Sequence, residues 1–155
     1  FVKDSNLKIE ELCFMNQNEW DKMLKNCGVL FIRGEESMSR ACLSGIPFVW
    51  HAYPQSDEYQ LVKVRALLER MAVHFKCEDF KIIENVWILI NSPENEVSQK
   101  EFENAITLFF ENIENLVYGF REFALDLRKN GDLCSNLMTF IKNKCIIKSN
   151  NRNLF

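Results

Sequence analysis

The chain has 155 residues, of which 47% are hydrophobic and 26% are charged, a composition typical of a globular domain long enough for one core. Its formal charge of −3, from 22 acids against 19 bases, lacks the basic excess that a nucleic-acid backbone requires, so we expect no nucleic-acid partner. No uncharged apolar run approaches the roughly 20 residues that cross a membrane, and the amino terminus has no signal-peptide pattern, so we expect no membrane partner.

The first predicted elements are a strand and the helix that follows it. The apolar run Leu12–Met15 predicts the strand. It ends at Asn16, a good N-cap residue, and Glu19 three positions later completes a capping box for a helix over about 17–26. Gly28 suits the left-handed residue that often ends such a helix.

Two further strands are predicted, with a helix between them. The second strand is the run Val29–Ile32, and the third follows Pro47 and includes His51. Gly34 opens the intervening helix. Three consecutive strand-to-helix steps predict half of a doubly wound parallel sheet, and therefore an α/β fold in which a short parallel sheet precedes a helical second half.

The second half shows only helical patterns. We expect a helix over 57–75 with an acidic first turn, a second over 78–91, one long helix from Ser98 to Gly131 with a capping box to Glu101, and a last one over 132–144. Residues 1–148 are interpreted as a single domain and residues 149–155 as a frayed tail. The Phe-rich stripe of the long helix favours a core face, although a groove for a partner protein would show the same pattern.

The six cysteines lie far apart, with no CxxC pair and no histidine cluster beside them. This spacing gives no metal site. We interpret them as reduced thiols that mostly fill the core, which favours a cytoplasmic protein.

The candidate site lies where the predicted strands end, because ligands of open parallel sheets bind outside the carboxyl ends of the strands. Arg33, at the end of a strand, and the helix start after it suit an anion such as a phosphate, because free backbone amides and a guanidinium both donate to its oxygens. Glu35 and Glu36 fit equally well as first-turn acids that complement the helix dipole, and Ser37 fits as a plain cap, so both interpretations stay open. Two carboxylates repel a phosphate, so at least one of them should turn away from it.

Two residues before the second strand extend this candidate site. Phe14 could stack on a base and Gln17 could hydrogen-bond it, although a lone Phe at a strand end is more often core. His51 is interpreted as structural rather than as a general base.

The strand-to-helix segments carry a resemblance to a known family. The stretches Phe31-Ile32-Arg33-Gly34-Glu35-Glu36-Ser37 and Gly45-Ile46-Pro47-Phe48-Val49-Trp50-His51-Ala52-Tyr53-Pro54-Gln55 closely resemble the carboxyl-terminal signature of the elongation factor P arginine rhamnosyltransferases. Residues 14–21 resemble the strand-to-helix segment that lies upstream in that family. The resemblance is strong over about 12–63 and weak over the later helices.

This resemblance implies a Rossmann-like carboxyl-terminal domain of a GT-B glycosyltransferase. It implies an inverting, metal-independent transfer of rhamnose from dTDP-rhamnose to a guanidinium nitrogen of an arginine on elongation factor P. The expected partners are therefore elongation factor P and dTDP-rhamnose, with no cofactor and no metal, and we expect a monomer. A related GT-B enzyme that uses another nucleotide sugar is the remaining enzymatic alternative.

The resemblance also implies roles for individual residues. Glu35 would serve catalysis by positioning the donor or the acceptor. The other residues would bind dTDP-rhamnose: Gln17 at the thymidine part, Phe14 on the base, Arg33, Glu36 and Ser37 at the diphosphate, and Tyr53 as a further donor contact.

Two departures from the family pattern follow. The family usually has Asp where this chain has Glu36, a change that leaves a backbone-amide contact possible. The amino-terminal domain, with the paired aspartates that activate the acceptor arginine, is expected to be missing. The chain alone should then bind donor poorly and not turn over.

Overall fold

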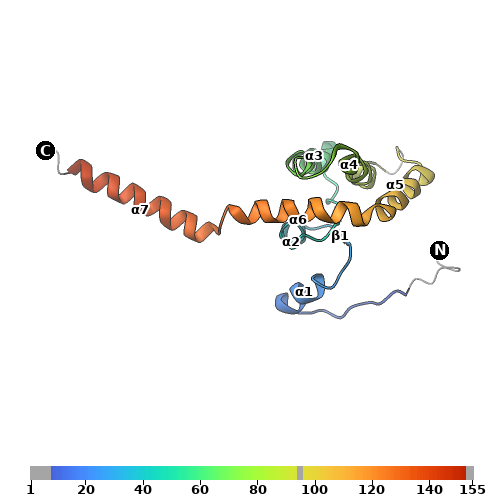
Figure 1. Ribbon diagram of the computed structural model, residues 1–155, viewed down its shortest axis with the longest axis horizontal. Coiled ribbons are helices and arrows are strands. Elements are labelled where there is room, and N and C mark those ends of the chain that lie inside the picture. Colours follow the sequence, from blue (N-terminus) through green and yellow to red (C-terminus); the bar gives the residue numbers. More distant parts are fainter. Residues whose placement is uncertain (1–7, 94–95, 153–155) are drawn as a thin grey trace.

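The computed structural model describes residues 8–93 and 96–152 (Figure 1). Two short strands and seven α-helices make up this part of the chain, with a short 3₁₀ turn, η1, after the second strand. In chain order they are α1 (Gln17–Leu24), β1 (Leu30–Ile32), α2 (Glu35–Ser44), β2 (Phe48–Trp50), η1 (Ser56–Glu58), α3 (Tyr59–Ala72), α4 (Cys77–Asn91), α5 (Gln99–Glu111), α6 (Ile113–Lys129) and α7 (Leu133–Arg152).

The two strands form a parallel pair that α2 connects. Leu30 pairs with Phe48 and Ile32 with Trp50. All three residues of β2 are buried, whereas the middle residue of β1, Phe31, is half exposed. β2 is therefore the covered strand. In Figure 1, α6 runs across the middle of the molecule, with α2 and the sheet on one side of it and α3 and α4 on the other.

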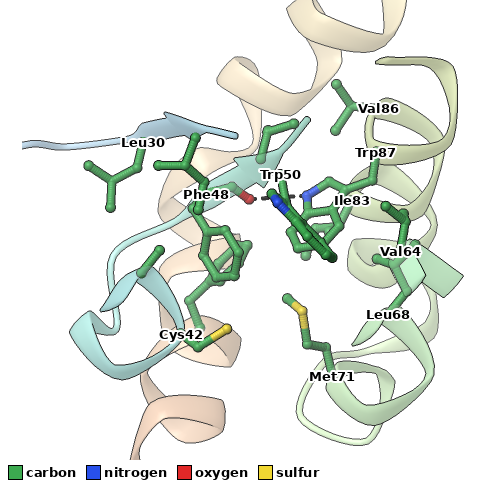
Figure 2. Packing of buried hydrophobic residues seen from close by; sticks show 14 of the residues in the cluster. Leu30, Cys42, Phe48, Trp50, Val64, Leu68, Met71, Ile83, Val86 and Trp87 are labelled. Carbon is green, nitrogen blue, oxygen red and sulfur yellow. Dashed lines mark hydrogen bonds between the residues drawn. The ribbon is translucent and has the colours of Figure 1, made fainter. Parts of the chain in front are cut away.

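The core gathers around Phe48 of β2. Its ring centroid lies 5.1 Å from that of Trp87 on α4 and 5.4 Å from that of Phe120 on α6. The Trp87 indole also donates a hydrogen bond of 3.1 Å to the Phe48 carbonyl, so burying this large side chain leaves its N–H satisfied (Figure 2). Phe109, Phe120 and Phe123 are all at most 1% exposed. These three Phe of the stripe are therefore core, as the spacing favoured, whereas Phe110 on the same stripe is 47% exposed.

Two predicted helix starts are confirmed. The Asn16 side chain accepts from the Glu19 amide at 3.1 Å, and the Glu19 carboxylate accepts from the Asn16 amide at 3.1 Å, which is the complete capping box of α1. At the start of α5, Ser98 accepts from the Glu101 amide at 3.2 Å, which is one of the two bonds of the predicted capping box.

The strand predicted over Leu12–Met15 is wrong. These residues have no regular structure, and the Phe14 side chain is fully exposed. An apolar run becomes a strand only where a neighbouring strand pairs with its backbone groups, and within residues 8–93 and 96–152 no strand does so. The three expected strand-to-helix steps therefore reduce to two paired strands, and the predicted half of a doubly wound sheet is not formed.

The long helix predicted from Ser98 to Gly131 is two helices. α5 and α6 meet at Asn112, whose φ of −103° and ψ of 7° are not helical. The Asn112 side-chain amide donates to the Leu108 carbonyl at 2.8 Å. Asn side chains compete in this way for backbone partners, which is why they favour helix ends over helix interiors.

Three further boundaries differ from prediction. α1 ends at Leu24 through a right-handed Lys25, so Gly28 is not its cap. α3 begins at Tyr59, because Asp57 and its neighbour take left-handed φ values of 55° and 54° before it. α7 continues through Arg152, because neither Gly nor Pro follows position 132 to end it. The tail expected from residue 149 therefore begins inside a helix, and its residues 153–155 lie outside the described part.

The cysteines do not mostly fill the core. Cys42 is buried and Cys27 half-buried, but Cys13, Cys77 and Cys134 are exposed, all five as free thiols, and the side chain of Cys145 lies outside the described part. Burial raises the pKa of the Cys42 thiol to about 12, so this thiol is not reactive at neutral pH. Over the described ranges, no helix is both long and apolar enough to cross a membrane.

Candidate functional site

The ends of both strands are fixed by hydrogen bonds between them. The Trp50 indole at the end of β2 donates to the Arg33 carbonyl at 2.7 Å, and the His51 amide donates to the Ile32 carbonyl at 2.8 Å. The backbone of Arg33 is thereby held at the edge of the sheet while its side chain stays exposed. The guanidinium carbon lies 4.9 Å from the centre of the Tyr53 ring, a cation–π contact that brings these two predicted site residues together.

Helix α2 begins at Glu35, two residues after Arg33, and no side chain of an N-cap residue bonds its first-turn amides. Its N-cap is Gly34, which has no side chain to bond them. A Cβ built at Gly34 would meet nothing within 4 Å, so the space in front of the helix is open. An uncapped helix start carries unpaired N–H groups and about half a positive charge, so this end of α2 suits an anion.

A cavity of about 470 Å³ lies between the start of α2 and the segment that leads into α1. It is lined by four of the predicted site residues, Phe14, Gln17, Glu36 and Ser37, and also by Arg40. Because Phe14 is fully exposed, it is not a core residue, and its ring is free to contact a ligand. The structure thus brings Phe14 and Gln17, the predicted contacts to the base, to the same cavity as the helix start. Three other predicted site residues do not line this cavity: Arg33, Glu35 and Tyr53.

Glu35, the first residue of α2, faces α3. Its carboxylate accepts a hydrogen bond from Lys63 Nζ at 3.4 Å. The hydrogen bond that the Glu35 carboxylate accepts from its own backbone amide, and then the bond from Lys63, lower the pKa of this carboxyl below its ordinary value of 4.5. Glu35 is therefore ionised at neutral pH and accepts protons or hydrogen bonds rather than donating them.

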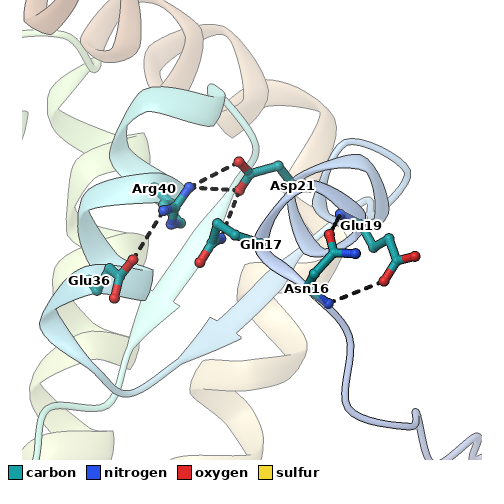
Figure 3. Close-up of polar contacts among 6 residues, drawn as sticks. All are labelled: Asn16, Gln17, Glu19, Asp21, Glu36 and Arg40. Carbon is teal, nitrogen blue, oxygen red and sulfur yellow. Dashed lines mark hydrogen bonds and ion pairs between the residues drawn. The ribbon is translucent and has the colours of Figure 1, made fainter.

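Glu36 is also paired. Arg40, one turn later, donates to its carboxylate at 3.0 Å and to both carboxylate oxygens of Asp21 on α1 at 2.8 and 3.0 Å (Figure 3). Asp21 in turn accepts from the Gln17 side chain at 3.2 Å. These hydrogen bonds, that of Glu36 above all, hold the pKa of the Arg40 guanidinium above its ordinary value. Both acids are paired with a base, and of the two only Glu36 lines the cavity, whereas Glu35 faces Lys63 of α3.

The sequence prediction missed Arg40, Asp21 and Lys63. Arg40 had a readable signal, because an acid followed four residues later by a base pairs on one face of a helix. Asp21 and Lys63 lie on other elements, and no local spacing indicates which carboxylate each one meets.

Two buried polar side chains, those of Asn91 and Gln60, hold the loop after β2 in place by hydrogen bonds. Asn91, at the end of α4, accepts from the Ala52 amide at 2.9 Å and donates to the Trp50 and Trp87 carbonyls at 2.7 Å each. Gln60 of α3 similarly accepts from the Gln55 amide at 3.0 Å and donates to the Asn91 carbonyl at 3.3 Å. The segment that carries Tyr53 is therefore anchored at both ends.

His51 lies beside a second cavity, of about 640 Å³, which is lined by the segment after β2, the end of α4, the start of α5 and residues that connect these two helices. Burial, and then the charge of Arg33, lower the pKa of His51 below its ordinary value of 6.5. The ring is therefore neutral at physiological pH. Among the side chains that the structure describes, no group of three or more His, Cys, Asp or Glu is placed to hold a metal ion.

Comparison with known proteins decides the family. A family model described as "Elongation-Factor P (EF-P) rhamnosyltransferase EarP" matches residues 1–142, more than nine tenths of the chain. The chain belongs to this family. The match also covers the helices after residue 63, where the motif resemblance alone was weak.

Individual EarP relatives agree with this assignment. The chain is 28% identical over 146 residues to a protein-arginine rhamnosyltransferase of Shewanella oneidensis, covering 91% of this chain and 35% of that protein. It is 33% identical over 91 residues to the enzyme of that name from Pseudomonas aeruginosa, covering 59% of this chain and 24% of that protein. The chain thus spans about a third or less of these relatives.

A solved structure described as the "structural basis for EarP-mediated arginine glycosylation of translation elongation factor EF-P" shares the fold. It superposes with a TM-score of 0.69 at 22% identity, covering 84% of this chain and 39% of the other. The arrangement of a short parallel sheet among helices is therefore that of part of an EarP protein.

Proposed function

We propose that this chain supplies the nucleotide-sugar site of a protein-arginine rhamnosyltransferase, which transfers rhamnose from dTDP-rhamnose to an arginine of elongation factor P. The observation that carries the proposal is the uncapped start of α2 between Arg33 and a cavity lined by Phe14 and Gln17, in a chain of the EarP family. An anion with several oxygens that is joined to a base matches this arrangement, with the oxygens at the helix start and the base in the cavity.

The proposed domain is a Rossmann-like unit over residues 1–148, the carboxyl-terminal part of a GT-B enzyme. Its two paired strands end at the proposed donor site. The acids that activate the acceptor arginine belong to the other domain of such an enzyme, and the arginine itself belongs to elongation factor P. This division agrees with a chain that covers 35% of its Shewanella oneidensis relative, and turnover then requires both domains.

In this proposal the diphosphate lies at the start of α2. The backbone amides of Glu36 and Ser37 donate to its oxygens, and the Arg33 guanidinium adds two directed donors. Both groups also stabilise the negative charge that develops on the leaving diphosphate, which is the work a metal ion does in metal-dependent transfers. The reaction is accordingly proposed to need neither a metal nor another cofactor.

Phe14 and Gln17 of the cavity, and Tyr53 outside it, are the remaining proposed contacts to the donor. Phe14, with its exposed ring, stacks on the thymine, and Gln17 hydrogen-bonds it from the first turn of α1. Tyr53 reaches the donor from the loop after β2, where its ring already lies against Arg33.

Glu35 is proposed as the catalytic residue because it stays ionised. A carboxylate with a lowered pKa cannot protonate a leaving group at neutral pH, but it binds and orients a guanidinium through charge-assisted hydrogen bonds. This fits an acceptor that is an arginine side chain.

The test is dTDP binding by wild type and by Arg33→Ala, measured by NMR titration of the folded chain. Losing a charge-assisted hydrogen bond to the ligand should weaken binding by about 1.5–3 kcal/mol. Arg65→Ala, an exposed arginine of α3, serves as the matched control and should bind like wild type. Equal affinities for Arg33→Ala and wild type would remove Arg33 from the diphosphate role. Competition among dTDP, UDP and GDP then identifies the nucleotide, and preference for UDP or GDP would replace dTDP-rhamnose as the donor.

A further inference from the structure

We propose that Arg40 is a positioning residue of the donor site. By pairing with Glu36 it neutralises the carboxylate that lies nearest the bound diphosphate, and by pairing with Asp21 it fixes α1 against α2. The inference rests on the proposed function, because it concerns how the same cavity accepts an anion.

The geometry places Arg40 between the two walls of the cavity. Its NH1 group donates to both oxygens of Asp21 on α1, at 2.8 and 3.0 Å, and its NH2 group donates to Glu36 on α2, at 3.0 Å. Gln17, the proposed base contact, is bonded to Asp21 at 3.2 Å. Figure 3 shows the resulting chain of side chains from Gln17 through Asp21 and Arg40 to Glu36.

The charges explain why such a residue is needed. Arg40 and Glu36 both line the cavity, so their opposite charges offset each other there, while Asp21, which also pairs with Arg40, brings the three-residue cluster to one net negative charge. Without Arg40, the wall nearest the diphosphate would carry an unpaired carboxylate, and like charges at close range repel. The guanidinium therefore makes the cavity acceptable to an anion by balancing Glu36.

Direct binding of the diphosphate by Arg40 is the competing role, and the present hydrogen bonds disfavour it. Both terminal nitrogens of the guanidinium already donate to carboxylates through charge-assisted hydrogen bonds. A phosphate contact would be left to the donors that these bonds do not use, which are the Nε–H and the second N–H of the NH2 group.

The two roles differ in how Arg40 and Glu36 depend on each other. If Arg40 acts by balancing Glu36, its removal is harmful only while the Glu36 carboxylate is present. If Arg40 binds the diphosphate itself, or merely holds the fold, its removal costs the same factor whether or not that carboxylate is present. A double-mutant cycle separates these cases.

The experiment measures the dissociation constant of dTDP, by NMR titration of the chain, for wild type, E36Q, R40Q and the double variant. We expect R40Q to raise the constant at least about tenfold relative to wild type, which corresponds to about 1.4 kcal/mol. In the E36Q background we expect R40Q to raise it less than about threefold, or about 0.7 kcal/mol. R65Q removes an arginine charge from the exposed surface of α3 and should match wild type.

Each other outcome overturns the inference. A similar factor for R40Q in both backgrounds would assign Arg40 to direct contact or to folding, and no effect of R40Q in either would remove it from the site. If wild type itself fails to bind dTDP, the proposed function fails and this inference fails with it. Binding by wild type with an unchanged R40Q refutes the inference alone.

Discussion

Replacing Asn91 with alanine should destabilise the chain strongly, because this buried side chain makes three hydrogen bonds. Asn91 is 4% exposed, and Ala52 and Trp50, which it bonds, are 3% and 2% exposed. The substitution leaves the Ala52 amide and the Trp50 carbonyl without this partner. Each buried group so orphaned costs about 1–3 kcal/mol, so the two predict a loss of about 2–6 kcal/mol in the free energy of unfolding.

Urea unfolding followed by tryptophan fluorescence measures this loss, because Trp50 and Trp87 adjoin the substituted residue. Ser92→Ala is the matched control: Ser92 donates one bond of 2.8 Å, within its own helix turn, to the Ile88 carbonyl. Its removal should cost about 1 kcal/mol or less. The reasoning is refuted if both variants lose the same small amount at an unchanged dependence on urea.

Three further predictions test other parts of the molecule. Phe120→Ala should lower the free energy of unfolding in urea by about 3–5 kcal/mol, as expected for truncation of a large core residue. A folded variant with wild-type stability would show that Phe120 is not part of the core. Burial and the charge of Arg33 lower the pKa of His51, so at about pH 6.5 and just below it the unfolded chain binds more protons than the folded chain. The free energy of unfolding should therefore fall as the pH drops from about 7.5 to about 5.5, and His51→Asn should make this dependence on pH weaker. An unchanged dependence on pH in His51→Asn would contradict this. Lys63→Met should raise the pKa of Glu35 toward 4.5, as followed by an NMR pH titration, and an unmoved titration would show that Lys63 does not act on Glu35.

Local sequence signals predicted the elements whose causes are local. The capping residues Asn16 and Ser98 identified two helix starts, because a cap needs only its own next three residues. The apolar runs around Leu30 and Phe48 identified the paired strands. Leu12–Met15 had the same local pattern and still failed, because pairing with another strand is not visible in the run itself.

The candidate site shows the same limit. The predicted base contact Gln17 and the helix-start residue Ser37 line one cavity in the structure. Arg33 and Tyr53 do not line this cavity and contact each other instead. This separation depends on how α1 packs against α2, a contact that includes the Arg40–Asp21 pair, whose members are 19 residues apart in the sequence. No spacing rule predicts such a pair.

The central claim is that this chain binds the nucleotide of the sugar donor at the start of α2. The most direct measurement is an amide chemical-shift titration of the folded chain with dTDP. The account predicts saturable shifts concentrated over Gly34–Ser37 and at Gln17, with the amides of α7 unaffected. A folded sample that shows no shifts in these residues at millimolar dTDP, or equal shifts throughout the chain, would contradict it.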